Sequence, residues 1–355
     1  MSGAPTATLN TVLATAKQFI NENVPHLETK RNGMFNLIQK KKKREDEAAT
    51  YMQFPVYSKK RTTQGAINGT TDLLDTSPQQ TNTFAQFQWK HDYLTVNLTL
   101  DELAKVGNGK NAVIKLASFA IKRGMTDFIL RISSNLFLSG YTTRIKELNG
   151  LADIFAASGT QYGQLTNTDT NLFDNTSEWL PIIDTTTAAV TPANINIMKG
   201  ILEDRTQGLV SQDGDAYELD TIVSNSMVYA ELQNNSTFPA ARFADLTDVK
   251  AGIEKFKYNG LDWLIDANSQ GTVDGSTADN YLYMLSSAAF HFLYRWGWDG
   301  TDSPIDNSDF ERLPNQTISM KAKFFSHNMA CDNRRVNAVF KALVCGNSTV
   351  GAITI

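Results

Sequence analysis

The sequence has few of the residues from which disulfide frameworks and zinc sites are built. Its 355 residues include two cysteines, Cys331 and Cys345, and four histidines. No histidine lies in H-E-x-x-H spacing or near a cysteine in zinc-ligand spacing. The strand-like pattern before Cys345 would separate the two sulfurs by far more than the about 7 Å that a disulfide allows between Cα atoms. We therefore expect two reduced thiols, as in a protein made in the cytoplasm.

Long hydrophobic runs are also missing. No apolar stretch approaches the roughly 20 residues of a membrane-spanning helix, and residues 1–5 lack the basic start of a signal peptide. Hydrophobic residues make up 41% and charged residues 20% of the chain, as is typical of a soluble globular protein. A chain of this length can bury a sizeable core, which we expect to be divided between two domains. These features predict no membrane partner.

Charge is distributed unevenly. Residues 1–44 hold eight Lys and Arg against two Glu, a net charge of +6, although the whole chain carries -4. The densest part of this basic segment is Lys40, Lys41, Lys42, Lys43 and Arg44. A basic segment on an acidic body indicates contact with a polyanion or with an acidic neighbour. The alternative is a solvated linker over residues 40–47.

The hydrophobic pattern predicts a long hairpin followed by a long helix. Tyr51–Tyr57 forms one strand, and residues 84–100 form the return strand, since Leu94 and Val96 alternate with polar residues. From residue 112 to 138 the apolar residues recur every three or four positions, which predicts a helix roughly 40 Å long. Residues 58–82 between the strands are polar and predict a loop tip. Such a hairpin is typical of a subunit that grips its neighbours.

The tip of this hairpin begins with three basic residues, Lys59, Lys60 and Arg61. They are candidates for contact with a neighbouring subunit's acidic surface. The alternative is that they only keep the tip soluble.

The second half of the chain predicts a mixed α+β domain over residues 192–296. Residues 158–177 are polar and predict a surface loop. Thr191 and Pro192 predict the start of a helix, Ser226 the cap of another, and Asn259-Gly260 a two-residue hairpin turn. Strands are expected at residues 221–223, 281–285 and 290–296. Two more, at residues 317–326 and 334–344, are expected to be joined by a turn.

Motifs that could carry chemistry are incomplete. His91-Asp92 has the composition of a metal dyad but lies in an alternating strand, where surface residues are expected. Asp266, Asn268 and Asp274 follow the opening of a calcium loop, yet Thr277 stands where the closing glutamate is needed. The sequence around Trp296 and Trp298 fits either a stacking platform or a domain core. We therefore predict no catalytic residues, no metal and no cofactor.

The order of these elements resembles the major capsid proteins of tailed bacteriophages, which have the Hong Kong 97-type fold. The resemblance covers nearly the whole chain. It is carried by TFAQFQWK at residues 83–90, LTVNLT at 94–99, LFLSG at 136–140, LNGL at 148–151, a polar loop ending at Trp179, KAKFF at 321–325 and DNRRV at 332–336.

The resemblance implies an α+β fold with named parts. These are an N-terminal arm (1–47), an extended loop (48–99), a peripheral domain with a spine helix (100–145 and 300–355) and an axial domain (146–299). It further implies a structural protein that forms pentamers and hexamers of an icosahedral shell around double-stranded DNA. The polyanion that the basic run at residues 40–44 would contact is then the genome, through non-specific electrostatic attraction, and the acidic neighbour is another subunit. Scaffold, portal and decoration proteins are then expected partners, the virion the location, and the host cytoplasm the place of assembly. Alternatives are an encapsulin-type nanocompartment shell and a soluble ligand-binding protein that uses Trp296 and Trp298.

Overall fold

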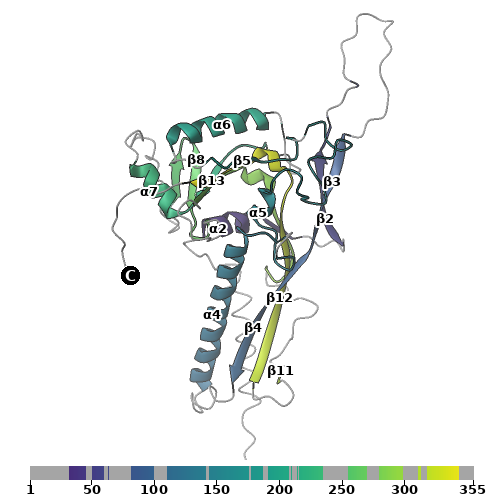
Figure 1. Cartoon of the computed structure of the whole chain (residues 1–355). Coiled ribbons are helices and arrows are strands. Elements are labelled where there is room, and N and C mark those ends of the chain that lie inside the picture. Colours follow the sequence, from purple (N-terminus) through teal and green to yellow (C-terminus); the bar gives the residue numbers. More distant parts are fainter. Residues whose placement is uncertain are drawn as a thin grey trace, which may run out of the picture.

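The computed structural model describes residues 32–44, 50–59, 63, 81–99, 110–140, 144–175, 177–186, 191–207, 209, 214, 216–234, 255–269, 280–298, 311–312 and 318–343. Most of the N-terminal arm and of the hairpin tip lies outside these residues. Two sheets dominate this part of the chain. The six-stranded sheet carries helices α6 and α7, and the five-stranded sheet extends away from it beside the long helix α4 (Figure 1). A separate two-stranded hairpin, β2 and β3, lies on the side of the molecule away from α7 (Figure 1).

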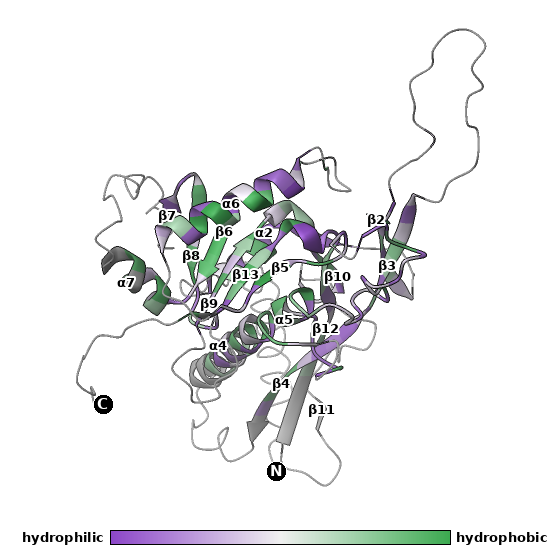
Figure 2. Cartoon of the chain, turned by 45° about the horizontal axis from the view of Figure 1, so that its top comes forward, coloured by the Kyte–Doolittle hydropathy of each residue, from purple (hydrophilic) through white to green (hydrophobic). Residues whose placement is uncertain are grey.

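The first sheet has six strands in the order β5-β13-β9-β6-β8-β7. Their bounds are Ile182–Asp184, Ala338–Leu343, Asn280–Leu285, Thr221–Ser224, Leu261–Ile265 and Lys255–Tyr258. Hydrophobic residues gather on β6, β8 and β13 beneath α6 (Figure 2). Because Asn259 and Gly260 both have positive φ, of 50° and 84°, they form the tight turn expected between β7 and β8.

Two helices pack on this sheet. α6 (Pro192–Thr206) begins as predicted, since the Thr191 side chain accepts a hydrogen bond from the backbone N–H of Asn194. α7 (Ser226–Asn234) is capped differently from the prediction. The Asn225 side chain, one residue earlier, accepts from the N–H of Val228. Ser226 is therefore the first helical residue and not the cap.

The second sheet has five strands. It joins β1 (Lys42–Arg44), β10 (Phe290–Trp296), β12 (Ile318–Cys331) and β11 (Glu311–Arg312), and β4 (Lys90–Thr99) also pairs with β12. The ladder between β4 and β12 runs antiparallel over ten residue pairs. Leu94 and Val96 face α4 (Lys110–Asn135), where Gly124 lets the helix approach them closely. The predicted apolar stripe is confirmed at its described positions, Met125, Phe128, Ile132 and Leu136, which are buried.

The hairpin consists of β2 (Tyr51–Tyr57) and β3 (Asn82–Gln88). The predicted return strand is wrong in one respect, because it is two strands that break at Trp89. β3 pairs with β2, whereas β4 leaves the hairpin and pairs with β12. The alternating pattern continues across the break, so the sequence shows no change where the pairing partner changes.

Two other predictions about strands are corrected. The last two strands do not pair with each other, because β12 belongs to the five-stranded sheet and β13 to the six-stranded one. Likewise, residues 290–296 were predicted to be part of the α+β domain of residues 192–296, but β10 pairs with β12 in the five-stranded sheet. Long-range pairing decides sheet membership, and strand patterns do not encode it. Residues 158–177 have no helix or strand where described, yet Tyr162, Leu165 and Phe173 are buried, so this loop is part of the core.

A buried arginine organises that loop. Arg334 lies between β12 and β13 and has no exposed surface. Its guanidinium donates to the carbonyl oxygens of Ile154 at 2.8 Å, Ala156 at 3.0 Å and Trp179 at 3.3 Å. It also lies over the Tyr162 ring, 5.0 Å from its centroid. Burial lowers the pKa of Arg334 to about 10, so the group remains charged at neutral pH.

Replacing Arg334 by methionine should destabilise the subunit by about 4 kcal/mol, since three buried carbonyls lose their donor. Arg334→Lys is the matched variant. It keeps the charge but not the planar set of donors, and we expect an intermediate loss. Urea unfolding followed by tryptophan fluorescence measures both. A methionine variant as stable as the wild type would contradict the organising role.

Candidate functional site

The basic run at residues 40–44 is folded. Lys40 ends helix α2 (Gly33–Lys40), and Lys42–Arg44 forms β1, which pairs in parallel with residues 292–294 of β10. The solvated-linker interpretation is therefore wrong for these residues, although residues 45–47 lie outside the described chain. The reason is that α2 buries Met34, Phe35 and Ile38 in the core and so fixes the position of the basic residues at its end. All five basic side chains are at least partly exposed.

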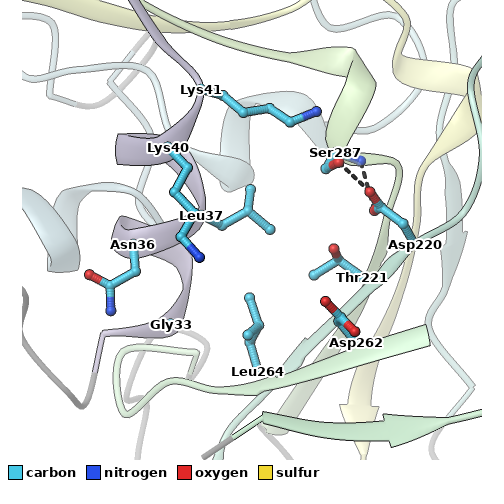
Figure 3. A pocket seen from close by; sticks show the side chains of 10 residues that line it. All are labelled: Gly33, Asn36, Leu37, Lys40, Lys41, Asp220, Thr221, Asp262, Leu264 and Ser287. Carbon is cyan, nitrogen blue, oxygen red and sulfur yellow. Dashed lines mark hydrogen bonds between the residues drawn. The ribbon is translucent and has the colours of Figure 1, made fainter. Parts of the chain in front are cut away.

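A cavity of about 180 Å³ lies between α2 and the six-stranded sheet. α2 lines one wall with Gly33, Asn36, Leu37, Lys40 and Lys41, and the opposite wall holds Asp220, Thr221, Asp262, Leu264 and Ser287. Lysines thus face carboxylates across the cavity (Figure 3). The Asp220 carboxylate already accepts hydrogen bonds from the backbone N–H and the hydroxyl of Ser287.

Asp266 anchors the beginning of α2. Its Oδ2 accepts from the backbone N–H of Met34 at 3.1 Å, and its Oδ1 accepts from the backbone N–H of Asn268 at 2.9 Å. Burial raises the pKa of this carboxyl. The aspartate that opens the calcium-like pattern therefore holds a helix N-terminus, where the first N–H groups lack partners. The rest of that pattern, from residue 270 on, lies outside the described residues.

The hairpin is attached to its own subunit at its base. Phe54 of β2 stacks on the His291 ring at 5.0 Å, and Phe87 of β3 meets Tyr162 edge-on at 5.0 Å. Lys59 comes after the last pair of the hairpin and is half-buried, whereas Lys60 and Arg61 lie outside the described residues. The role of these three residues in subunit contact stays a prediction.

Sequence reasoning missed a buried charge cluster. Asp92 was expected at the surface, yet its side chain is buried and forms an ion pair with Arg131 of α4. Arg131 also lies 3.6 Å from Glu147, and Asp92 Oδ2 lies 3.2 Å from His327 Nε2 on β12. A signal was available, because Asp92 has the same phase in the strand as the buried Leu94 and Val96.

His327 is a neutral member of this cluster. Its Nδ1 accepts from the indole N–H of Trp298 at 3.2 Å, so the hydrogen sits on Nε2 and faces Asp92. Burial, with the nearby Arg131 charge as a second cause, lowers the pKa of His327 to about 3. The cluster therefore joins α4, β4 and β12 without a charged histidine at neutral pH.

The aromatic residues form a core and not a stacking platform. Trp298 is 1% exposed and packs against Phe35, Phe128, Phe292 and Phe325. Gly297, with φ of 96°, allows this, since a Cβ there would lie 2.6 Å from the Phe325 ring. Trp296 is half-buried and stacks on the exposed His91. Ligand stacking on the Trp296 and Trp298 pair is thereby contradicted.

Within the described residues, no group of three or more His, Cys, Asp or Glu could hold a metal ion. Across the same part of the chain, no helix is long and apolar enough to cross a membrane. Cys331 is a free, buried thiol whose pKa is raised by burial, and Cys345 lies outside the described residues.

No protein-family model and no curated protein sequence matches the chain. Solved structures do match it. A chain from the capsid asymmetric unit of cyanophage A-1(L) superposes with a TM-score of 0.63 at 13% identity, covering 90% of this chain and 94% of that one. The chain has the fold of phage major capsid proteins. The capsid of a native GTA particle (TM-score 0.53, 12% identity, 87% and 90% covered) and that of cyanophage Pam1 (0.51, 13%, 89% and 94%) are similar as well.

This likeness confirms the mixed α+β class and the capsid fold that the order of elements indicated. At 12–13% identity it concerns the fold alone. The matches cover 87–90% of this chain and 90–94% of the other chains, so the likeness extends over most of the fold.

The buried His327 should make the subunit sensitive to acid. Its pKa is near 3 when folded and about 6.5 when unfolded, so the unfolded chain takes up the proton first. Stability is then complete above about pH 6.5 and falls toward pH 3, by at most about 1.4 kcal/mol per pH unit. His327→Gln keeps an acceptor for Trp298 and should remove this component from urea unfolding curves recorded between pH 7 and 4.

His91→Gln is the matched control, because that ring is exposed, and it should alter the slope much less. Parallel pH profiles for wild type and His327→Gln would show that His327 does not titrate as proposed.

Proposed function

We propose that this protein is the major capsid protein of a tailed bacteriophage, which self-assembles into an icosahedral shell around double-stranded DNA. The observation that carries the proposal is the match to a chain from a cyanophage capsid over 90% of this chain and 94% of that one. The likeness thus extends over most of both chains. We further propose that the protein is not an enzyme.

The parts of the fold take the roles that the resemblance implies. We assign residues 1–47 to an N-terminal arm, 48–99 to an extended loop, 100–145 and 300–355 to a peripheral domain with α4 as its spine helix, and 146–299 to an axial domain. In this assignment β13 completes the axial sheet although it comes from the C-terminal segment. Each domain then contributes a strand to the other, since β10 completes the peripheral sheet.

Exposed apolar side chains support self-association. Ile197 and Ile201 lie one turn apart on the outer face of α6 and are 62% and 43% exposed. Phe119 and Leu130 are exposed on α4, and Met227 on α7. Single exposed apolar residues are normal, but pairs on the outer faces of helices are typical of surfaces that pack against other chains. The partner we propose is a second copy, in pentamers and hexamers.

The basic residues take two proposed roles. Lys40, Lys41, Lys42, Lys43 and Arg44 contact the genome or a neighbouring subunit, and Lys59, Lys60 and Arg61 contact a neighbour at the hairpin tip. Contact with DNA would be non-specific and salt-dependent, because it depends on phosphate charge. Scaffold, portal and decoration proteins are proposed as further partners, with assembly in the host cytoplasm and residence in the virion.

Negative-stain microscopy of the purified protein tests the proposal. We expect closed shells tens of nanometres across, because the proposed function is self-assembly of this subunit. Monomers in every buffer and at every protein concentration would overturn it. The alternative, an encapsulin-type compartment, predicts shells that co-purify with a folded enzyme as cargo. Mass spectrometry of the shell contents therefore separates the two.

The projecting hairpin should be needed for shells and not for folding. Its base is buried in its own subunit, so replacing residues 62–80 by a short Gly-Ser turn keeps the pairs of β2 with β3 and the bond from Ser58 N–H to Thr81 O. We expect unchanged circular dichroism and an unchanged unfolding midpoint, with shell yield at least tenfold lower in sedimentation. The triple variant Lys59→Gln, Lys60→Gln, Arg61→Gln isolates the charge of the tip. Normal shells from the deletion variant would refute the intersubunit role.

A further inference from the structure

Two arginines that are far apart in the sequence meet at the C-terminal end of α6. Arg335 belongs to the short helix η5 (Arg334–Val336), which packs against α6. Its Nη2 donates a hydrogen bond to the backbone carbonyl oxygen of Arg205 at 3.1 Å. Arg205 and Arg335 are both half-buried, so their side chains are partly removed from water and still reach the surface.

The bond to the helix end uses only a small part of the hydrogen-bonding capacity of these arginines. The last carbonyls of a helix lack partners within the helix, so one donor of Arg335 caps α6. An arginine side chain has five N–H donors and no acceptor. The Nε of Arg335 is buried and has no hydrogen-bond partner within the described chain. A buried donor without an acceptor is destabilising, and an acceptor from outside the chain would relieve this.

The positive charge of the two arginines is not neutralised by the residues that the structure describes. Among these residues, neither Arg205 nor Arg335 forms an ion pair. The carboxylate of Glu203, two positions before Arg205 in α6, lies 3.4 Å from Lys199 Nζ. Burial lowers the pKa of Arg205, and the neighbouring charge of Arg335 lowers it further. The two guanidinium groups are therefore close enough to repel each other.

The negative end of the helix dipole does not account for this arrangement. The C-terminal end of a helix carries a partial charge of about half a unit, which attracts a cation. Such a partial charge explains one arginine at the end of α6. It does not neutralise two whole positive charges, and a second cation beside the first adds repulsion.

We propose that Arg205 and Arg335 form a binding site for an oxyanion, a phosphate or a carboxylate, at the C-terminal end of α6. Guanidinium groups donate parallel hydrogen bonds to the oxygens of such anions, and these bonds are stronger where water is partly excluded. A bound anion gives the buried Nε an acceptor and neutralises charges that otherwise repel. The site belongs to a single subunit, so the proposal does not depend on assembly into shells.

Urea unfolding of the free subunit in different sodium salts tests the site. A ligand that binds only the folded chain stabilises it by an amount that depends on its concentration and dissociation constant. We expect about 50 mM phosphate to lower the unfolding equilibrium constant about tenfold relative to chloride at equal ionic strength, as for a dissociation constant of about 5 mM. Acetate at the same ionic strength is the second ligand. A larger effect of phosphate assigns the site to phosphate groups, and a larger effect of acetate assigns it to carboxylates.

Arg205→Gln is the variant that decides between an anion site and a purely structural role. The Arg205 side chain makes no hydrogen bond within the described residues, so the substitution removes none. The variant should lose the response to the anion. In chloride it should be at least as stable as the wild type, because the repulsion from Arg335 is gone. Arg335→Lys keeps a charge near the helix end without the planar set of donors and should respond less than the wild type.

Lys40→Gln with Lys41→Gln is the matched control, because it removes two positive charges from α2 and its end and leaves α6 untouched. This variant should respond to the anions as the wild type does. Equal stabilisation of wild type and Arg205→Gln would overturn the proposal, because the anion would then act on the protein surface in general. A wild type that neither phosphate nor acetate stabilises would overturn it as well.

Discussion

The buried guanidinium of Arg334 is the interaction on which the junction of the two sheets depends. It sits where the chain passes from β12 to β13, and it binds three carbonyls of a segment that has almost no regular structure. A buried cation is costly unless its donors are satisfied, so the loop must keep one conformation around it. Tyr162 then has a fixed place, and its hydroxyl accepts the backbone N–H of Cys331 at the end of β12.

Local signals predicted local structure well. The strand Tyr51–Tyr57, the start of α6 at Thr191 and the turn at Asn259-Gly260 each depend on residues a few positions apart, and all three are confirmed. The order of such elements was enough to indicate the capsid fold. What the sequence did not reveal was pairing over long distances. The alternating pattern runs without a break from β3 into β4. However, β3 pairs with β2, about 30 residues earlier, and β4 pairs with β12, more than 200 residues later. The residues of a strand do not indicate which other strand it will pair with.

At the candidate site too, the sequence indicated local features but not the contacts between distant residues. A run of five basic residues was visible in the sequence. Its position at the end of α2 and in β1, with Lys40 and Lys41 across a cavity from Asp220 and Asp262, depends on contacts between distant parts of the chain. The cluster of Asp92, Arg131 and His327 was partly accessible, because Asp92 shares its phase with Leu94 and Val96. A charged residue on the buried face of a strand needs an oppositely charged or hydrogen-bonding partner on another element. The pattern of the strand does not show which residue that partner is.

The break at Trp89 has a mechanical consequence. β3 and β4 are one continuous stretch of backbone, so tension on the hairpin passes directly into β4 and is resisted along its length by the ten residue pairs that join it to β12. Load applied parallel to such a ladder must shear many hydrogen bonds together instead of opening them one by one. Arg131 fastens the same strand to α4 through Asp92. If a neighbouring subunit held the hairpin, the force would therefore act on β4, which is joined to β12 by hydrogen bonds and to α4 by an ion pair. The six-stranded sheet and its helices α6 and α7 would bear little of that force.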